Sequence, residues 1–242
     1  MEKIDYKEEF KQFGSKIYII GILTILTLFT LGLIQIAISI LLILSLKHIK
    51  KINEGLENTF LSKFRIRILI AAVINLIGAV ISVVITIFLN VFILRFGVIH
   101  YPLSAQSVAT FWMLLRLFLF IMIFAAILGF ITGVLNMIAW NELNNFFREK
   151  KDVFPLNISK KAIKGAVRLR KAYLFIIVVG VLVTLMTIYL FLLPFTVATY
   201  YGSIVHLFII IFPIILGIVT GILGLMSFIF TILGYFDLSN LK

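Results

Sequence analysis

The sequence contains no cysteine among its 242 residues. Disulfides, thiol catalysis and zinc or iron–sulfur sites with cysteine ligands are therefore excluded. Charged residues are also scarce, because Asp, Glu, Lys and Arg make up only 13% of the chain, about half of their share in soluble domains. Apolar residues account for 62%. A soluble fold of this length could not bury so much apolar surface, so the composition predicts an integral membrane protein.

Acidic residues are missing from two long stretches of the chain. No Asp or Glu occurs between residues 58 and 141, or between 153 and 236. Ion-coupled transport, paired-carboxylate catalysis and an acidic metal site all need carboxylates within the membrane, so the sequence argues against these functions. A glycine-rich phosphate loop, a GxSxG elbow and an HExxH motif are also missing. We therefore expect a protein that is not an enzyme and that uses no metal or cofactor.

Long apolar runs are what the sequence does have. Five of them cover residues 17–46, 68–94, 107–140, 172–200 and 204–236. Each exceeds the roughly 20 residues that a helix needs to cross the hydrocarbon layer. They predict an all-α integral membrane protein, a bundle of about five transmembrane helices in a single domain over residues 1–242. One alternative divides the first run near Gly32 into a hairpin of two shorter helices.

Basic residues gather in two segments, 47–67 with six Lys or Arg and 141–171 with nine. By the positive-inside rule both segments and the C-terminus lie in the cytoplasm of a multi-pass protein of the cell membrane. Five spans then place the N-terminus outside. Because the cations flank apolar spans, we expect anionic lipid headgroups as their partners and no nucleic acid. The candidate lipid contacts are Lys47, Lys50, Lys51, Lys63, Arg65, Arg67, Lys160, Lys161, Lys164, Arg168, Arg170 and Lys171.

The first basic segment has the periodicity of a helix. Apolar residues recur every three or four positions from Ile49 through Ile52 to Phe64, which makes one apolar stripe. Two interpretations are open. The segment could lie in the headgroup layer as an amphipathic helix, or a transmembrane helix could continue through it.

The chain matches itself when it is shifted. A shift of 101 residues pairs Gly32 with Gly133, Gln35 with Asn136, and four basic positions of the first basic segment with four of the second. A shift of 88 residues relates GFITGVL (129–135) to GIVTGIL (217–223). These matches predict a tandem parallel repeat. Its units cover about 15–101 and about 116–202, with an extra half unit at about 203–236, so that helices 1–2 match helices 3–4 and helix 5 echoes helix 3.

The first repeat unit contains a span with a glycine followed by a lysine-rich amphipathic stretch, GLIQIAISILLILSLKHIKKINEG, and then a second apolar span. This arrangement resembles small archaeal multi-pass membrane families that are classed as domains of unknown function. The resemblance covers residues 15–95 and again 117–190 through loose motifs. It implies a helical membrane fold and no activity or site residue.

Several uncharged residues within the spans are candidates for helix packing. The GxxxG patterns let helices approach closely, within one chain or between copies, and amides hydrogen-bond to neighbouring helices. The candidates are Gly32, Gln35, Gly129, Gly133, Asn136, Gly217 and Gly221.

Four cationic or titratable residues cluster toward the opposite side from the basic segments. They are either an anion site or anchors at the membrane interface. One of them, Arg116, could lie within the membrane or at its surface. These residues are Arg95, His100, Arg116 and His206.

Taken together, these patterns favour a non-enzymatic membrane protein, an accessory or membrane-organising protein that binds anionic lipid through its basic segments. It could form a homo-oligomer or join a larger membrane complex. The alternative is an uncoupled transporter or channel for a small neutral or anionic solute, because a facilitator needs no carboxylate in the membrane.

Overall fold

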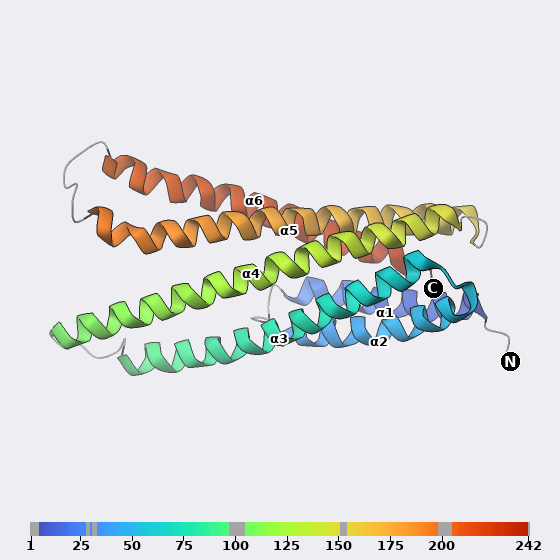
Figure 1. Cartoon of the computed structure of the whole chain (residues 1–242), viewed down its shortest axis with the longest axis horizontal. Helices are drawn as coiled ribbons and strands as arrows, with labels where there is room; N and C mark the ends of the chain where they lie inside the picture. Colours follow the sequence, from blue (N-terminus) through green and yellow to red (C-terminus); the bar gives the residue numbers. More distant parts are fainter. Residues whose placement is uncertain are drawn as a thin grey trace.

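The computed structural model describes residues 5–27, 30, 33–96, 105–150, 154–197 and 205–241. Six helices make up nearly all of these ranges, which contain no strand. They lie along one long axis (Figure 1) and are α1 (Tyr6–Leu26), α2 (Leu33–Leu56), α3 (Thr59–Phe96), α4 (Ala105–Glu149), α5 (Leu156–Val197) and α6 (Val205–Ser239). Five of them, α2 to α6, are long and apolar enough to cross a membrane. The prediction of an all-α bundle with about five such helices is confirmed.

The first apolar run forms two helices, so the prediction of a single helix over 17–46 is wrong. α1 ends at Leu26 and α2 begins at Leu33, as in the alternative of a hairpin. The hydroxyls of Thr24 and Thr27 donate to backbone carbonyls one turn earlier, at 2.8 and 2.6 Å. Such bonds compete with the backbone hydrogen bonds of the helix, and they mark where α1 stops.

α1 is too polar to cross a membrane on its own. It begins at the cap formed by Asp5, whose carboxylate accepts hydrogen bonds from two backbone N–H groups, and residues 6–16 carry five charges. Only residues 17–26 are free of charge and mostly apolar, which is about 15 Å of helix against about 30 Å of hydrocarbon. α1 and α2 therefore occupy only the half of the bundle that holds both termini, whereas α3 to α6 run its full length (Figure 1).

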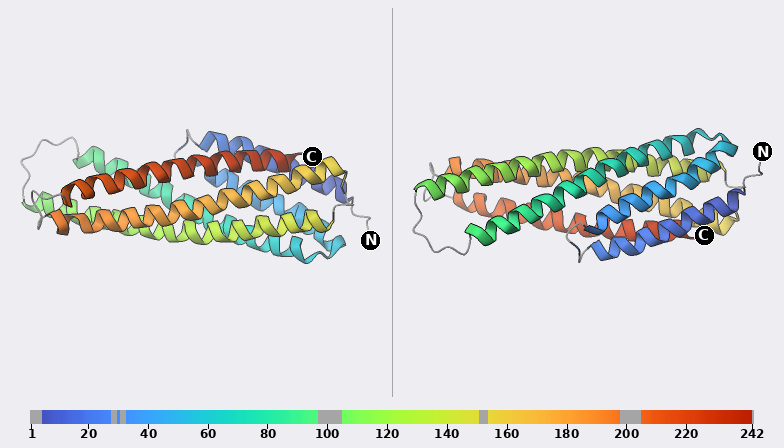
Figure 2. Two further views of the ribbon diagram at one scale, coloured as in Figure 1. Left: turned by 90° about the horizontal axis from the view of Figure 1, so that it is seen from above. Right: turned by 90° about the horizontal axis from the view of Figure 1, so that it is seen from below.

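At the end of the bundle that holds the termini, the six helices form a complete ring. Consecutive helices pack against each other, and α1 packs against α6 (Figure 2). One such contact joins Tyr18 of α1 and Phe236 of α6, with ring centroids 5.7 Å apart. Six helices thus surround a common centre where α1 and α2 are present. Beyond the α1–α2 turn, α3 to α6 continue without them.

The N-terminal residues lie at the same end as both basic segments, so the prediction that they lie on the opposite side is wrong. Glu9 Oε1 is 2.9 Å from Lys51 Nζ, and the ring of Phe10 packs edge-on against Phe154 with centroids 4.7 Å apart. A hairpin returns the chain to the end from which it started, which a single spanning helix cannot do.

Both basic segments continue the long helices. The first forms the end of α2 and the start of α3, and the second forms the end of α4 and the start of α5. The apolar stripe packs inward, because Ile49, Ile52 and Phe64 are fully buried. Of the two interpretations of the first segment, the structure therefore favours continuing helices over an amphipathic helix in the headgroup layer.

Candidate functional site

Charged residues begin at a common level on five neighbouring helices. The first charged residue beyond the apolar stretch is Lys47 in α2, Arg67 in α3, Glu142 in α4, Lys171 in α5 and Asp237 in α6. Ion pairs place α3 and α4, and likewise α5 and α6, at matching levels, since Arg67 pairs with Glu142 and Arg168 pairs with Asp237. We call the part of the molecule beyond this level the basic end.

The twelve cations predicted to contact lipid divide into two groups. Seven of them have a partner within the protein or are half-buried. Four form ion pairs: Arg67 with Glu142, Arg168 with Asp237, Lys50 with Glu54, and Lys51 with Glu9. Lys161 donates a hydrogen bond to Asn240, Arg170 donates one to Asn141, and Arg65 is half-buried. The others are exposed and make no ion pair within the described ranges. These five are Lys47, Lys63, Lys160, Lys164 and Lys171.

A charged network that the sequence did not predict ties α1 to α2. His48 Nδ1 lies 2.6 Å from Glu9 Oε2, and its Nε2 lies 2.9 Å from Lys16 Nζ. Because an ammonium group can only donate, Nε2 accepts and Nδ1 carries the proton given to Glu9. Burial by itself would raise the pKa of Glu9, but the hydrogen bonds from Lys51 and His48, together with the positive charge of Lys51, outweigh it and lower the pKa below its ordinary value of 4.5.

The interior of the bundle at the charged level is a tightly packed apolar core. Its largest fully buried side chains are aromatic. Phe64 packs on Trp140 with ring centroids 5.3 Å apart, and Trp140 meets Tyr235 edge-on at 6.2 Å. Phe13 of α1 packs against the other side of Phe64 at 6.5 Å. These buried aromatic side chains form a layer between the basic end and the middle of the ring.

A cavity of about 250 Å³ lies at the centre of the ring, on the side of the aromatic layer that faces away from the basic end. All six helices line it, and none of its lining residues is charged. We call it the central chamber. Its polar lining residues are Thr24, Gln35, Ser39, Asn75, Thr132, Tyr173, Thr231 and Tyr235.

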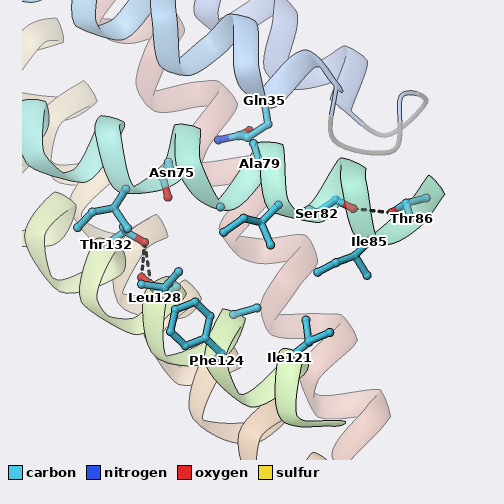
Figure 3. A pocket seen from close by; sticks show the side chains of 15 residues that line it. Gln35, Asn75, Ala79, Ser82, Ile85, Thr86, Ile121, Phe124, Leu128 and Thr132 are labelled. Carbon is cyan, nitrogen blue, oxygen red and sulfur yellow. Dashed lines mark hydrogen bonds between the residues drawn. The ribbon is translucent and has the colours of Figure 1, made fainter. Parts of the chain in front are cut away.

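The central chamber continues into a larger cavity of about 450 Å³ between α3 and α4, here called the α3–α4 groove. Gln35, Asn75, Gly129 and Thr132 line both. Figure 3 shows Asn75 on α3 and Thr132 on α4 on facing walls, with Gln35 reaching in from α2. The remaining lining of the groove is mostly apolar. The amides of Gln35 and Asn75 thus both line the place where the apolar groove joins the polar chamber.

The glycines predicted for helix packing behave differently from one another. A Cβ at Gly133 would lie 2.9 Å from Ile177 Cγ1, so this glycine does allow close packing of α4 against α5. Nothing lies within 4 Å of a Cβ at Gly129, Gly217 or Gly221, which shows that these three bring no other described helix close. A contact between copies of the chain stays a prediction for them. Gly32 lies outside the described residues.

Asn136 is the other amide that the sequence singled out, and it is only 1% exposed. Its Nδ2 donates to the backbone carbonyl of Thr132 at 2.8 Å, but its Oδ1 has no hydrogen-bond partner in the described part of the chain. Asn144, two turns further along α4, also has an unpartnered Oδ1. α4 therefore carries unsatisfied acceptors toward the interior, where leaving them unpaired costs stability.

The predicted anion site on the opposite side lies outside the described part of the structure. His100 lies outside the described residues, and the side chains of Arg95, Arg116 and His206 also fall outside them. Among the residues that are described, no group of three His, Asp or Glu could hold a metal ion.

No family model, no curated protein and no solved structure matches this chain. The resemblance to archaeal membrane families stays a prediction from the residues that carry it. The basic end, the central chamber and the α3–α4 groove are the features of the described residues that bear on function.

Proposed function

We propose that this protein is a non-enzymatic, multi-pass membrane protein whose basic end binds anionic lipid headgroups in the cytoplasmic leaflet. In this role it acts as an accessory or membrane-organising protein. The observation that carries the proposal is the position of three exposed lysines at and just beyond the charged level. Lys47 and Lys171 lie at that level, and Lys63 lies one helical turn beyond Arg67. We call these three the boundary lysines.

Charge supports this assignment. The protein has a formal net charge of +12, and the boundary lysines make no ion pair among the described residues. Each basic residue near an anionic membrane surface contributes about 1 kcal/mol of binding free energy. Just below the charged level, Leu44 and Leu174 expose about half of their surface. An anionic lipid can therefore bury its chains against leucines while its phosphate meets a lysine.

The test is the selective retention of phosphatidylglycerol. The full chain is extracted from bilayers of phosphatidylglycerol and phosphatidylcholine, and the lipids that stay bound are counted by native mass spectrometry. We expect enrichment of phosphatidylglycerol, and replacing the three boundary lysines by Gln should weaken its binding by about 100-fold at low salt. High salt should reduce the difference between wild type and variant.

A matched control removes the same charge elsewhere. Lys11, Lys50 and Lys150 each lie within 4 Å of a glutamate, so their replacement by Gln should change lipid retention little. Equal losses in both triple variants would leave only net charge as the cause and would overturn the proposed site. An unenriched wild-type protein would overturn lipid selectivity itself.

A second candidate function, an uncoupled transporter, is favoured by the central chamber. Its lining has hydrogen-bonding groups and no charge, which suits a neutral solute better than an anion. Uptake of a neutral solute into proteoliposomes, compared with protein-free liposomes, tests this function. Uptake equal to that of protein-free liposomes would rule out the transporter for that solute.

A further inference from the structure

The α3–α4 groove opens toward the membrane. Ile81 and Phe124 line it and expose 39% and 49% of their surface. They belong to helices whose outward faces are apolar over the same stretch. A molecule dissolved in the bilayer can therefore enter between α3 and α4 from the side. On the side of the basic end, the chamber borders the aromatic layer, because Tyr235 both lines the chamber and packs against Trp140.

The inner end of the groove offers unused hydrogen-bonding groups. The side-chain amides of Gln35 and Asn75 make no hydrogen bond to another described residue. Each amide has two donors and one acceptor oxygen. Asn75 lies eight residues from Arg67, which places it about 12 Å inside the charged level. Polar groups at such depth cost free energy unless they find partners.

A ligand of these two cavities must therefore carry a polar group that can give up its hydration at the membrane surface. A phosphate or a carboxylate would lose its hydration without finding a cation, since neither cavity has a charged lining residue. An uncharged head with hydroxyl or amide groups can pair with Gln35, Asn75 and Thr132. The chamber, at about 250 Å³, has the volume of about eight water molecules, which is enough for such a head.

We propose that the central chamber and the α3–α4 groove bind a single-chain lipid with an uncharged, hydroxyl- or amide-bearing head. Its head lies between Gln35 and Asn75, and its chain follows the apolar lining of the groove. At about 450 Å³ the groove falls within the 300–1,000 Å³ range of ligand pockets. This inference does not depend on the lipid binding proposed for the basic end.

The experiment uses a monoacylglycerol with a photoreactive diazirine in its acyl chain and the full protein in phosphatidylcholine nanodiscs. After illumination, the labelled residues are mapped by mass spectrometry. We expect labels on α3 and α4 among the apolar residues of the groove, removed by excess unlabelled monoacylglycerol. The free fatty acid with the same diazirine chain should label the groove about tenfold less, the factor that corresponds to 1.4 kcal/mol.

Two glycines supply the test variants and a third supplies the control. Nothing lies within 4 Å of a Cβ at Gly129 or Gly78, which line the groove, or at Gly180, which lines a separate surface cavity between α4 and α5. Gly129→Leu and, from the opposite wall, Gly78→Leu should each fill the groove and reduce labelling about tenfold. Gly180→Leu adds the same bulk outside the groove and should leave labelling unchanged.

Three results would overturn the inference. Labels spread evenly over the lipid-facing sides of α5 and α6 would show that the groove is not a site. Equal labelling by the fatty acid would show that the chamber does not select an uncharged head. Unchanged labelling in a folded Gly129→Leu or Gly78→Leu protein would place the chain elsewhere. The first two comparisons use the wild-type protein and decide the matter even if both leucine variants fail to fold.

Discussion

Gly165 of α5 and Gly234 of α6 face each other across the contact between these helices. A Cβ at Gly165 would lie 2.8 Å from the carbonyl oxygen of Gly234, and a Cβ at Gly234 would lie 2.6 Å from Leu169 Cγ. The two glycines let the backbones approach more closely than side chains would allow. Close to them, Arg168 pairs with Asp237 and ties the same two helices together.

The first prediction follows from this contact. Gly165→Ala should lower the free energy of unfolding by about 1–3 kcal/mol, because a backbone carbonyl cannot move aside for the added methyl group. Gly217→Ala on the open face of α6 should be neutral or should stabilise by up to about 1 kcal/mol, the difference in helix propensity. Reversible unfolding in mixed micelles measures both values. Equal effects of the two substitutions would contradict the packing described for Gly165.

The second prediction concerns topology, and the lack of native cysteine makes it simple to test. Single cysteines at Lys11, Glu54 and Lys160 should all react with a membrane-impermeant maleimide from the same side of the membrane, because the three positions lie at the basic end. If that end is cytoplasmic, labelling in intact cells requires permeabilisation. Labelling of Lys11→Cys alone from outside would contradict the placement of α1.

The third prediction is a pH dependence carried by Glu9. Its pKa is lowered in the folded protein, so its contribution to stability is complete above its ordinary value of 4.5 and is lost as pH falls through the lower folded value. Lys16, His48 and Lys51 are the titratable partners that face it through the network. The thermal midpoint of the wild type should exceed that of Glu9→Gln at neutral pH, and the gap should close in the acidic range. A gap that persists at the lowest pH would contradict the assignment.

The fourth prediction concerns the unpartnered acceptor of Asn136. Asn136→Leu replaces a buried unsatisfied amide by an apolar side chain of similar volume, so the stability should stay equal or rise by about 1–3 kcal/mol. Thr132→Val, which removes a hydroxyl that bonds to the backbone of its own helix, is the comparison and should change stability less. Unfolding free energies in the same mixed micelles decide. A clear loss of stability in Asn136→Leu would mean that its Oδ1 has a partner such as a bound water.

Much of the fold could be predicted from hydropathy, because α3 to α6 are each apolar far beyond the length of one crossing. The first run was predicted wrongly because its turn contains Thr, Leu, Phe and Gly, which lower the hydropathy too little to mark a break. Counting five spans then placed the N-terminus on the side opposite the C-terminus, which is why its predicted side was also wrong. The contact of Glu9 with Lys51 depends on the hairpin, which the sequence indicated only as an alternative near Gly32.

The candidate site could be predicted only in part. The repeat drew attention to Gln35 and Asn136, and Gln35 does line the central chamber, but the partnership with Asn75 depends on how α2 packs beside α3. Positions Arg67 and Arg168 align in the repeat, and each forms an ion pair with the helix that follows. The repeat itself stays a prediction. Gly165 and Gly234 belong to no GxxxG pattern, so only tertiary packing reveals them.

The contact between α1 and α6 sets the order in which the protein can be assembled. Gly21 meets Tyr235, more than 200 residues later in the chain, which a ribosome reaches after about 10–40 s. Until then the buried face of the N-terminal hairpin has no sixth helix to cover it. The newly made hairpin therefore needs a temporary cover from lipid or from a membrane chaperone, and a chain truncated before α6 leaves that face permanently open to quality-control proteases.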